Sequence, residues 1–193
     1  MRAAILVCLA LTALTLTLTP AIAVAEPAPD APYLNAVSLA LPSIDGLRGA
    51  QVSYERWCPC HRLSLAVSGQ LRQTASVDFG GLTAGVGAEL RWYWRARAWL
   101  THQHRGSMVG WFLGARVDVA ADWLHDRVDD RWLGTGMAFG VATRVGYRIA
   151  PWRGLEVTPL TGLAWREQVD LNGRVPAKGA FAVVFGLTLG WMF

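Results

Sequence analysis

The clearest indication of the fold is the C-terminal stretch Phe181-Ala182-Val183-Val184-Phe185-Gly186-Leu187-Thr188-Leu189-Gly190-Trp191-Met192-Phe193. Every second residue, counted back from Phe193, is large and apolar, whereas the residues between them are mostly small. A period of two is that of a β-strand whose two faces meet different surroundings. A large apolar face opposite a small one predicts a strand with lipid on one side and a crowded barrel interior on the other.

Five of these positions form an alternating apolar pattern that ends on an aromatic residue: Phe185, Leu187, Leu189, Trp191 and Phe193. The pattern resembles the C-terminal assembly signal of bacterial outer-membrane proteins. The resemblance implies export to a Gram-negative envelope and insertion into the outer membrane by the barrel-assembly machinery.

The N-terminal residues fit the same compartment. Arg2 precedes an apolar run from Ala3 to Leu18, and Ala23-Val24-Ala25 provides a small-residue cleavage site. This order is typical of a secretory signal peptide. We therefore expect a cleaved signal peptide at 1–25, a short periplasmic segment at 26–34 and an outer-membrane barrel at 35–193.

The composition favours strands over helices as the membrane-crossing elements. Hydrophobic residues make up 53% of the chain and charged residues only 17%, yet no run of 18 apolar residues follows residue 25. A membrane barrel has this composition because every second residue faces away from lipid. The net charge of +4 comes without a basic cluster interleaved with stacking aromatics, so we expect no nucleic-acid partner.

Seven further segments show the same alternation before the C-terminal strand. They span about 35–44, 50–57, 63–73, 82–95, 109–123, 136–149 and 155–165. The count of eight predicts an all-β fold, an eight-stranded antiparallel up-and-down transmembrane β-barrel. Closure is required because lipid offers no partner for the backbone groups of an open sheet edge.

An even strand number places both termini in the periplasm. The outer loops are then expected at 45–49, 74–81, 124–135 and 167–179. Aromatic residues gather near the strand ends, including Trp57, Trp92, Trp111 and Trp191 at the periplasmic side, and predict two interfacial belts.

Short motifs add a family resemblance. Val52-Ser53-Tyr54-Glu55-Arg56, Leu63-Ser64-Leu65, Glu89-Leu90-Arg91-Trp92-Tyr93 and Val145-Gly146-Tyr147-Arg148 resemble segments of a family of uncharacterised eight-stranded bacterial outer-membrane barrels, a domain of unknown function. The resemblance covers most of the chain after residue 25. It implies no catalytic residues, because the family carries no established activity.

Charged residues fall on the predicted inward faces of the strands: Glu55, Arg72, Glu89, Arg91, Arg116, Asp118, Arg144, Arg148 and Glu156. Opposite charges in a low-dielectric interior must pair, since an unpaired one is costly. An eight-stranded barrel is only wide enough to be filled by side chains. We expect a structural charge network inside the barrel and no continuous pore.

Enzymatic chemistry has little support in the sequence. A lipid A hydrolase needs a nucleophile, a histidine base and an orienting acid, but the four histidines (His61, His102, His104 and His125) form no His-x-Ser motif. His102 and His104 alone do not complete a metal site. Asp126, Asp129 and Asp130 alternate with arginines that neutralise them. We therefore expect no catalytic residues, no metal and no cofactor.

The tetrapeptide Cys58-Pro59-Cys60-His61 lies in a predicted periplasmic turn and is one residue short of a haem attachment motif. An oxidising compartment favours a disulfide between Cys58 and Cys60. A ring across one residue would be strained, so free or metal-linked thiols remain the alternative.

Together these patterns predict an integral outer-membrane barrel with a structural or envelope-integrity role. Its expected partners are outer-membrane lipid, lipopolysaccharide and the barrel-assembly machinery, and it is expected to be a monomer. Surface binding or adhesion through the outer loops is a second hypothesis, and a lipid A-modifying enzyme is a third.

Overall fold

The structure is a computed structural model that describes residues 34–43, 47–58, 62–75, 79–94, 109–126, 131–152, 154–170 and 178–193. The expected signal peptide and the expected periplasmic segment, apart from Leu34, lie outside these residues. Within the described part of the chain, no helix is long and apolar enough to cross a membrane.

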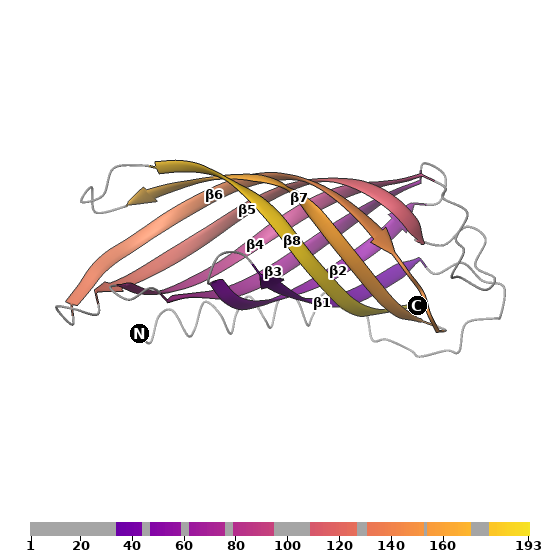
Figure 1. The fold of residues 1–193 in the computed structure, drawn as a ribbon, viewed down its shortest axis with the longest axis horizontal. Helices are drawn as coiled ribbons and strands as arrows, with labels where there is room; N and C mark the ends of the chain where they lie inside the picture. The colour runs from indigo at the N-terminus through magenta and orange to yellow at the C-terminus, as the bar shows by residue number, and fades with distance from the viewer. Residues whose placement is uncertain are drawn as a thin grey trace.

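Eight strands form a closed barrel in which each strand pairs with its neighbours along the chain, and β1 pairs with β8 (Figure 1). All pairings are antiparallel. The strands are β1 (Asn35–Ser43), β2 (Leu47–Cys58), β3 (Leu63–Ala75), β4 (Phe79–Trp94), β5 (Gly110–Asp126), β6 (Arg131–Arg148), β7 (Leu155–Asp170) and β8 (Lys178–Met192). The fold class predicted from the sequence is confirmed.

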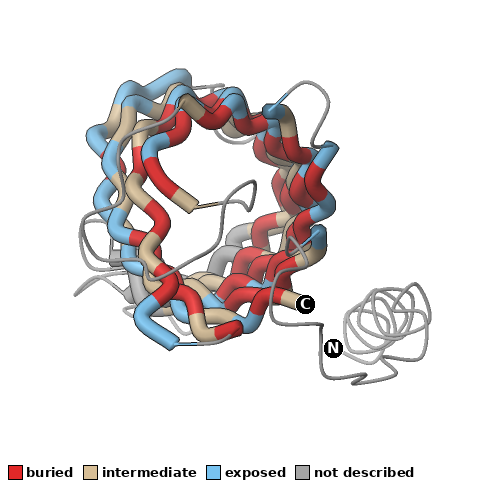
Figure 2. Tube along the Cα trace, turned by 90° about the vertical axis from the view of Figure 1, so that its right-hand side faces the viewer, coloured by how far each residue is buried: buried red, intermediate tan, exposed pale blue. Residues whose placement is uncertain are grey.

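The two faces of the sheet differ as the alternation predicts. Figure 2 shows buried and exposed residues alternating along the tube around the ring. On β8 the outward residues Phe185 and Leu189 are 62% and 51% exposed, while the inward Val184 and Thr188 are buried. Exposure of an apolar belt of this extent to water would be unfavourable, so the outer wall of the barrel is a surface for lipid.

The C-terminal strand closes the barrel. β8 pairs with β1 from Ala36↔Met192 to Ser43↔Phe185. Beyond the strand, the Asn35 N–H donates to the Phe193 carbonyl at 3.0 Å, and the Phe193 N–H donates to the Asn35 carbonyl at 2.9 Å. This reciprocal pair ends the seam at the rim where both described chain ends lie.

The strands extend farther at the opposite rim than the sequence predicted. Most of the expected outer loops belong to the sheet: 47–49 are in β2, 167–170 are in β7, and β5 and β6 remain paired as far as Asp126↔Arg131. The prediction was wrong there because it followed apolar alternation. Outside the lipid layer a hairpin keeps its backbone ladder with polar residues on both faces.

Pro159 lies inside β7 and faces outward, whereas Leu160 faces inward. The β6–β7 ladder is continuous up to Gly146↔Leu160 and resumes at the isolated bridge Ile149↔Val157. Proline has no N–H to donate, which explains the interruption. The weak alternation of this segment in the sequence thus corresponds to a continuous strand whose pairing with β6 is interrupted near Pro159.

Candidate functional site

The interior of the barrel holds the polar chemistry of this protein, and one half of it is organised around the Glu55 carboxylate on β2. Arg91 of β4 contacts Glu55 Oε2 through Nη1 at 2.6 Å, and Arg148 of β6 contacts the same oxygen through Nη2 at 2.5 Å. The hydroxyl of Tyr93 donates to Oε1 at 2.8 Å, and that of Ser64 donates to the same oxygen. Glu55 is therefore shared by side chains from three other strands, β3, β4 and β6.

Arg148 also reaches a second carboxylate. Its Nε lies 2.9 Å from Oε2 of Glu156 on β7, and both side chains are 0% exposed. The guanidinium thus lies between Glu55 and Glu156 and joins two walls of the barrel. Such an arrangement matches the planar fork of arginine, which can bind two carboxylates at once.

Glu89 is the centre of the next layer. Its Oε2 lies 3.1 Å from Arg91 Nη2, 3.4 Å from Arg144 Nη1 and 4.0 Å from Arg116 Nη1. Arg116 has a closer partner in Asp118 of the same strand, at 2.5 Å from Nη2 and 2.8 Å from Nε. One carboxylate therefore faces three guanidinium groups.

The structure places all nine sequence-predicted charged residues in strands and brings eight of them into linked ion pairs. Arg72 stands apart: its partner is the neutral Gln70 of the same strand, with Nη2 to Oε1 at 2.5 Å. Among the described residues, no carboxylate lies within ion-pair distance of Arg72.

Small inward residues make room for these charges. A Cβ on Gly114 would lie 2.4 Å from Glu89 Oε1, and one on Gly87 would lie 2.3 Å from Asp118 Oδ1. At Gly190 it would lie 2.7 Å from Glu156 Oε1. Gly87, Gly114 and Gly190 thus leave space that acidic side chains fill.

Sequence reasoning missed a second cluster nearer the opposite rim. Arg166 of β7 contacts both oxygens of Asp122 at 2.8 and 3.0 Å, and Thr83 donates to the same carboxylate at 2.5 Å. The alternation along the strands could have revealed this cluster, because Asp122 and Arg166 occupy inward-facing positions of β5 and β7. The predicted end of the seventh strand at residue 165 hid Arg166.

An aromatic floor closes the barrel at the rim where Asn35 and Phe193 lie. It consists of Ala36, Trp57, Tyr93, Phe112, Ala150 and Met192, all less than 9% exposed. Trp57 was expected in an interfacial belt, and this prediction was wrong. Trp57 does lie near the end of β2, as expected. It alternates in phase with Gln51, Ser53 and Glu55, however, and so faces inward.

The floor is joined to the ion pairs. The guanidinium of Arg91 lies 4.8 Å from the centre of the Phe112 ring, which itself lies 5.5 Å from the Tyr93 ring. Arg148 lies 5.7 Å from the Tyr93 ring. Cation–π contacts of desolvated arginines stabilise this junction between apolar and charged layers.

We expect Phe112→Ala to lower the free energy of unfolding by about 3 kcal/mol, because it leaves a cavity in a fully buried layer. Chemical denaturation of the barrel in lipid vesicles measures this. Phe181→Ala, at a ring that is 84% exposed, is the matched control and should cost clearly less. Equal losses for the two variants would contradict a packed floor.

The remaining sequence-predicted residues contribute less to the interior. Cys58 is exposed at the end of β2, and Cys60, His61, His102 and His104 lie outside the described residues, so the disulfide stays a prediction. No group of three or more potential metal ligands occurs in the described part of the chain. The C-terminal pattern faces outward at Phe185, Leu187, Leu189 and Trp191.

A closed eight-stranded antiparallel sheet with an apolar outer wall and a charged interior defines a membrane β-barrel of the outer-membrane kind. No family model matches the chain, and no curated protein matches it. Among solved structures it is similar to the crystal structure of Neisserial surface protein A (NspA), with 13% identity, a TM-score of 0.48 and coverage of 82% of this chain and 93% of that one. At that identity nothing about function transfers, and the resemblance to an uncharacterised barrel family stays a prediction.

Proposed function

We propose that this protein is an integral component of a Gram-negative outer membrane with a structural role in envelope integrity. The observation that carries the proposal is the filled interior. Phe112, Met192, Arg148 and Glu156 are all 0% exposed across one end of the barrel. A barrel sealed in this way supports a role in the membrane itself over transport through it.

The outer wall supports the choice of partners. Its exposed leucines, valines and phenylalanines suit the acyl chains of outer-membrane lipid and lipopolysaccharide. A single chain supplies all eight strands, which suits a monomer. The outward pattern Phe185, Leu187, Leu189, Trp191 and Phe193 at the closing strand suits recognition by the barrel-assembly machinery before the seam forms.

The interior charge network serves stability in this proposal and has no catalytic role. Its arginines and carboxylates contact one another across the barrel, which supports a structural use of these charges. A role in surface binding would depend on the outer connections, which are shorter than the sequence predicted.

Deletion of the gene should raise the permeability of the outer membrane, measured as entry of a fluorescent hydrophobic probe that the intact envelope excludes. Expression of the wild-type chain in the deletion strain should restore exclusion. An unchanged permeability barrier would contradict the proposal.

Two further measurements separate the alternatives. Mass spectra of lipid A should be the same with and without the gene, whereas a changed acylation pattern would favour the lipid-modifying enzyme. Shortening the connection at 171–177 should leave the restored barrier intact, whereas loss of cell-surface attachment in that variant would favour adhesion.

A further inference from the structure

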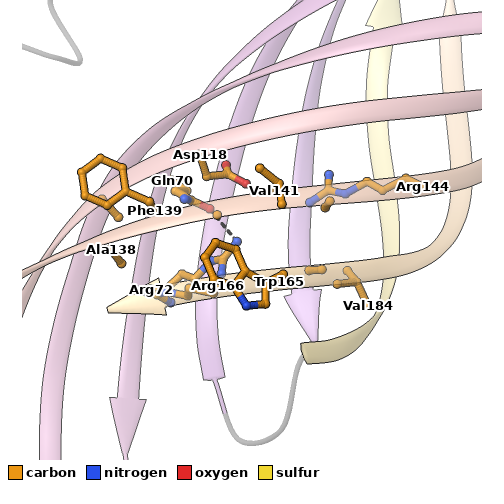
Figure 3. Close-up of a pocket in the computed structure, with 14 residues that line it drawn as sticks. Gln70, Arg72, Asp118, Ala138, Phe139, Val141, Arg144, Trp165, Arg166 and Val184 are labelled. Carbon is orange, nitrogen blue, oxygen red and sulfur yellow. Dashed lines mark hydrogen bonds between the residues drawn. The ribbon is translucent and has the colours of Figure 1, made fainter. Parts of the chain in front are cut away.

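A cavity of about 60 Å³ lies inside the barrel, between the charge network and the rim opposite the floor. Its polar lining consists of Gln70 and Arg72 from β3, Asp118 from β5, Arg144 from β6 and Arg166 from β7 (Figure 3). The rest of the wall combines small residues, including Ala138, Gly140 and Ala164, with the larger Phe139, Val141, Trp165 and Val184. The strands thus leave a space that three arginines line.

The charges that line this cavity do not balance. Asp118 is held by Arg116 at 2.5 Å, and Arg166 is held by Asp122 at 2.8 Å. Among the described residues, Arg72 has the neutral Gln70 as its hydrogen-bond partner and no carboxylate within ion-pair distance. In the described part of the chain, the ion pair of Arg144 is with Glu89 at 3.4 Å, a carboxylate that Arg91 and Arg116 also contact. Arg72 and Arg144 therefore bring positive charge that the surrounding carboxylates do not match.

The described inward side chains as a whole also carry more positive than negative charge. Six arginines (Arg72, Arg91, Arg116, Arg144, Arg148 and Arg166) face five carboxylates (Glu55, Glu89, Asp118, Asp122 and Glu156). The buried Nε atoms of Arg72 and Arg144 have no hydrogen-bond partner among the residues that the structure describes. A guanidinium cannot relieve its burial by losing a proton, so it needs an acceptor or a counter-charge.

We propose that this cavity binds one small oxyanion, a phosphate group, between Arg72 and Arg144. Guanidinium groups bind phosphate oxygens through two parallel N–H donors. A water molecule needs about 10–15 Å³ of such space, so a cavity of about 60 Å³ accommodates a single tetrahedral ion. The inference does not depend on the role in envelope integrity.

Burial indicates the direction of entry. The Arg166 side chain is 34% exposed and that of Asp118 is 18% exposed, whereas Arg148 and Glu156 beyond the network are 0% exposed. The phosphate group therefore enters from the rim opposite the floor. It is either a free ion or the terminal group of a phosphate ester that reaches in from that rim.

Equilibrium dialysis of the refolded barrel in detergent against radiolabelled inorganic phosphate tests the proposal. The wild-type barrel should bind phosphate saturably. Arg72→Gln and Arg144→Gln should each weaken binding by about tenfold or more, since each removes a charge-assisted contact. Arg56→Gln, on the exposed outer face of β2, is the matched control and should bind as the wild type does.

Binding by Arg72→Gln that equals the wild-type binding would overturn the proposal, as would a wild-type barrel that binds no phosphate. Folding of each variant is checked by its shift on a denaturing gel before and after boiling. If a glutamine variant does not fold, Arg72→Lys keeps the charge without the fork and should bind with intermediate affinity. Competition with glucose 1-phosphate separates the sources: displacement assigns the site to phosphate esters, and no displacement assigns it to the free ion.

Discussion

Glu55→Gln is expected to destabilise the barrel by about 4 kcal/mol, because it removes the carboxylate that Arg91 and Arg148 share and leaves both buried guanidinium groups with less counter-charge. Arg91 and Arg148 both contact Glu55 Oε2, and the side chains of all three are at most 5% exposed. Glutamine keeps the shape of the side chain but offers one acceptor oxygen and no charge. The two guanidinium groups would then face each other across a neutral group.

The free energy of unfolding from denaturant titrations in vesicles measures this loss. Glu167→Gln is the matched control, because it removes the same charge from an outward position near the far rim of β7. Glu167 is half-buried and lies outside the buried charge network, so its effect should stay within about 0.5 kcal/mol. A loss below about 1 kcal/mol for Glu55→Gln would show that the network is not a stabilising core.

Gly190→Val is expected to prevent closure of the barrel. A Cβ at this position would lie 2.4 Å from the carbonyl oxygen of Val37 and 2.6 Å from the Cβ of Ser38, both on β1. Neither is the end of a flexible side chain, so relief requires the two strands to move apart. Because β1 and β8 form the seam, their separation opens the sheet, and an open edge in lipid leaves backbone groups unpaired.

The readout is migration on a denaturing gel. A closed barrel that resists detergent migrates differently before and after boiling, and we expect this shift for the wild type and its loss for Gly190→Val. Gly69→Val is the matched control, since a Cβ on Gly69 meets nothing within 4 Å. A normal shift for Gly190→Val, or the loss of the shift in both variants, would contradict the role assigned to this glycine.

The alternation of β8 was enough to predict both its strand and its outward face, because lipid and interior impose opposite demands on successive residues. The same rule predicted the inward placement of Glu55, Glu89 and Arg148. It could not predict which charges pair, since Glu55 and Arg148 are 93 residues apart and meet only through barrel curvature. The prediction for Trp57 was wrong because it used only the position of the residue near the end of a strand, which suggested an interfacial belt. The alternation along the strand places its side chain inside the barrel.

The extent of the strands at the rims and the presence of the cavity could not be predicted from the sequence, for a related reason. Outside the lipid layer, polar residues such as Glu167 and Gln168 suit a paired strand as well as a loop. Whether Arg72 finds a carboxylate depends on the reach of side chains from three other strands. Local patterns do not contain that information.

The contact between Arg148 on β6 and Glu55 on β2 also bears on how the chain reaches its final state. No single hairpin contains both partners, and the Arg144–Glu89 pair likewise joins β6 to β4. A partly inserted sheet would therefore carry unmatched charge into the bilayer. Strand insertion and curling must advance together, so the folding transition of this barrel should be a single cooperative step without a stable half-formed sheet.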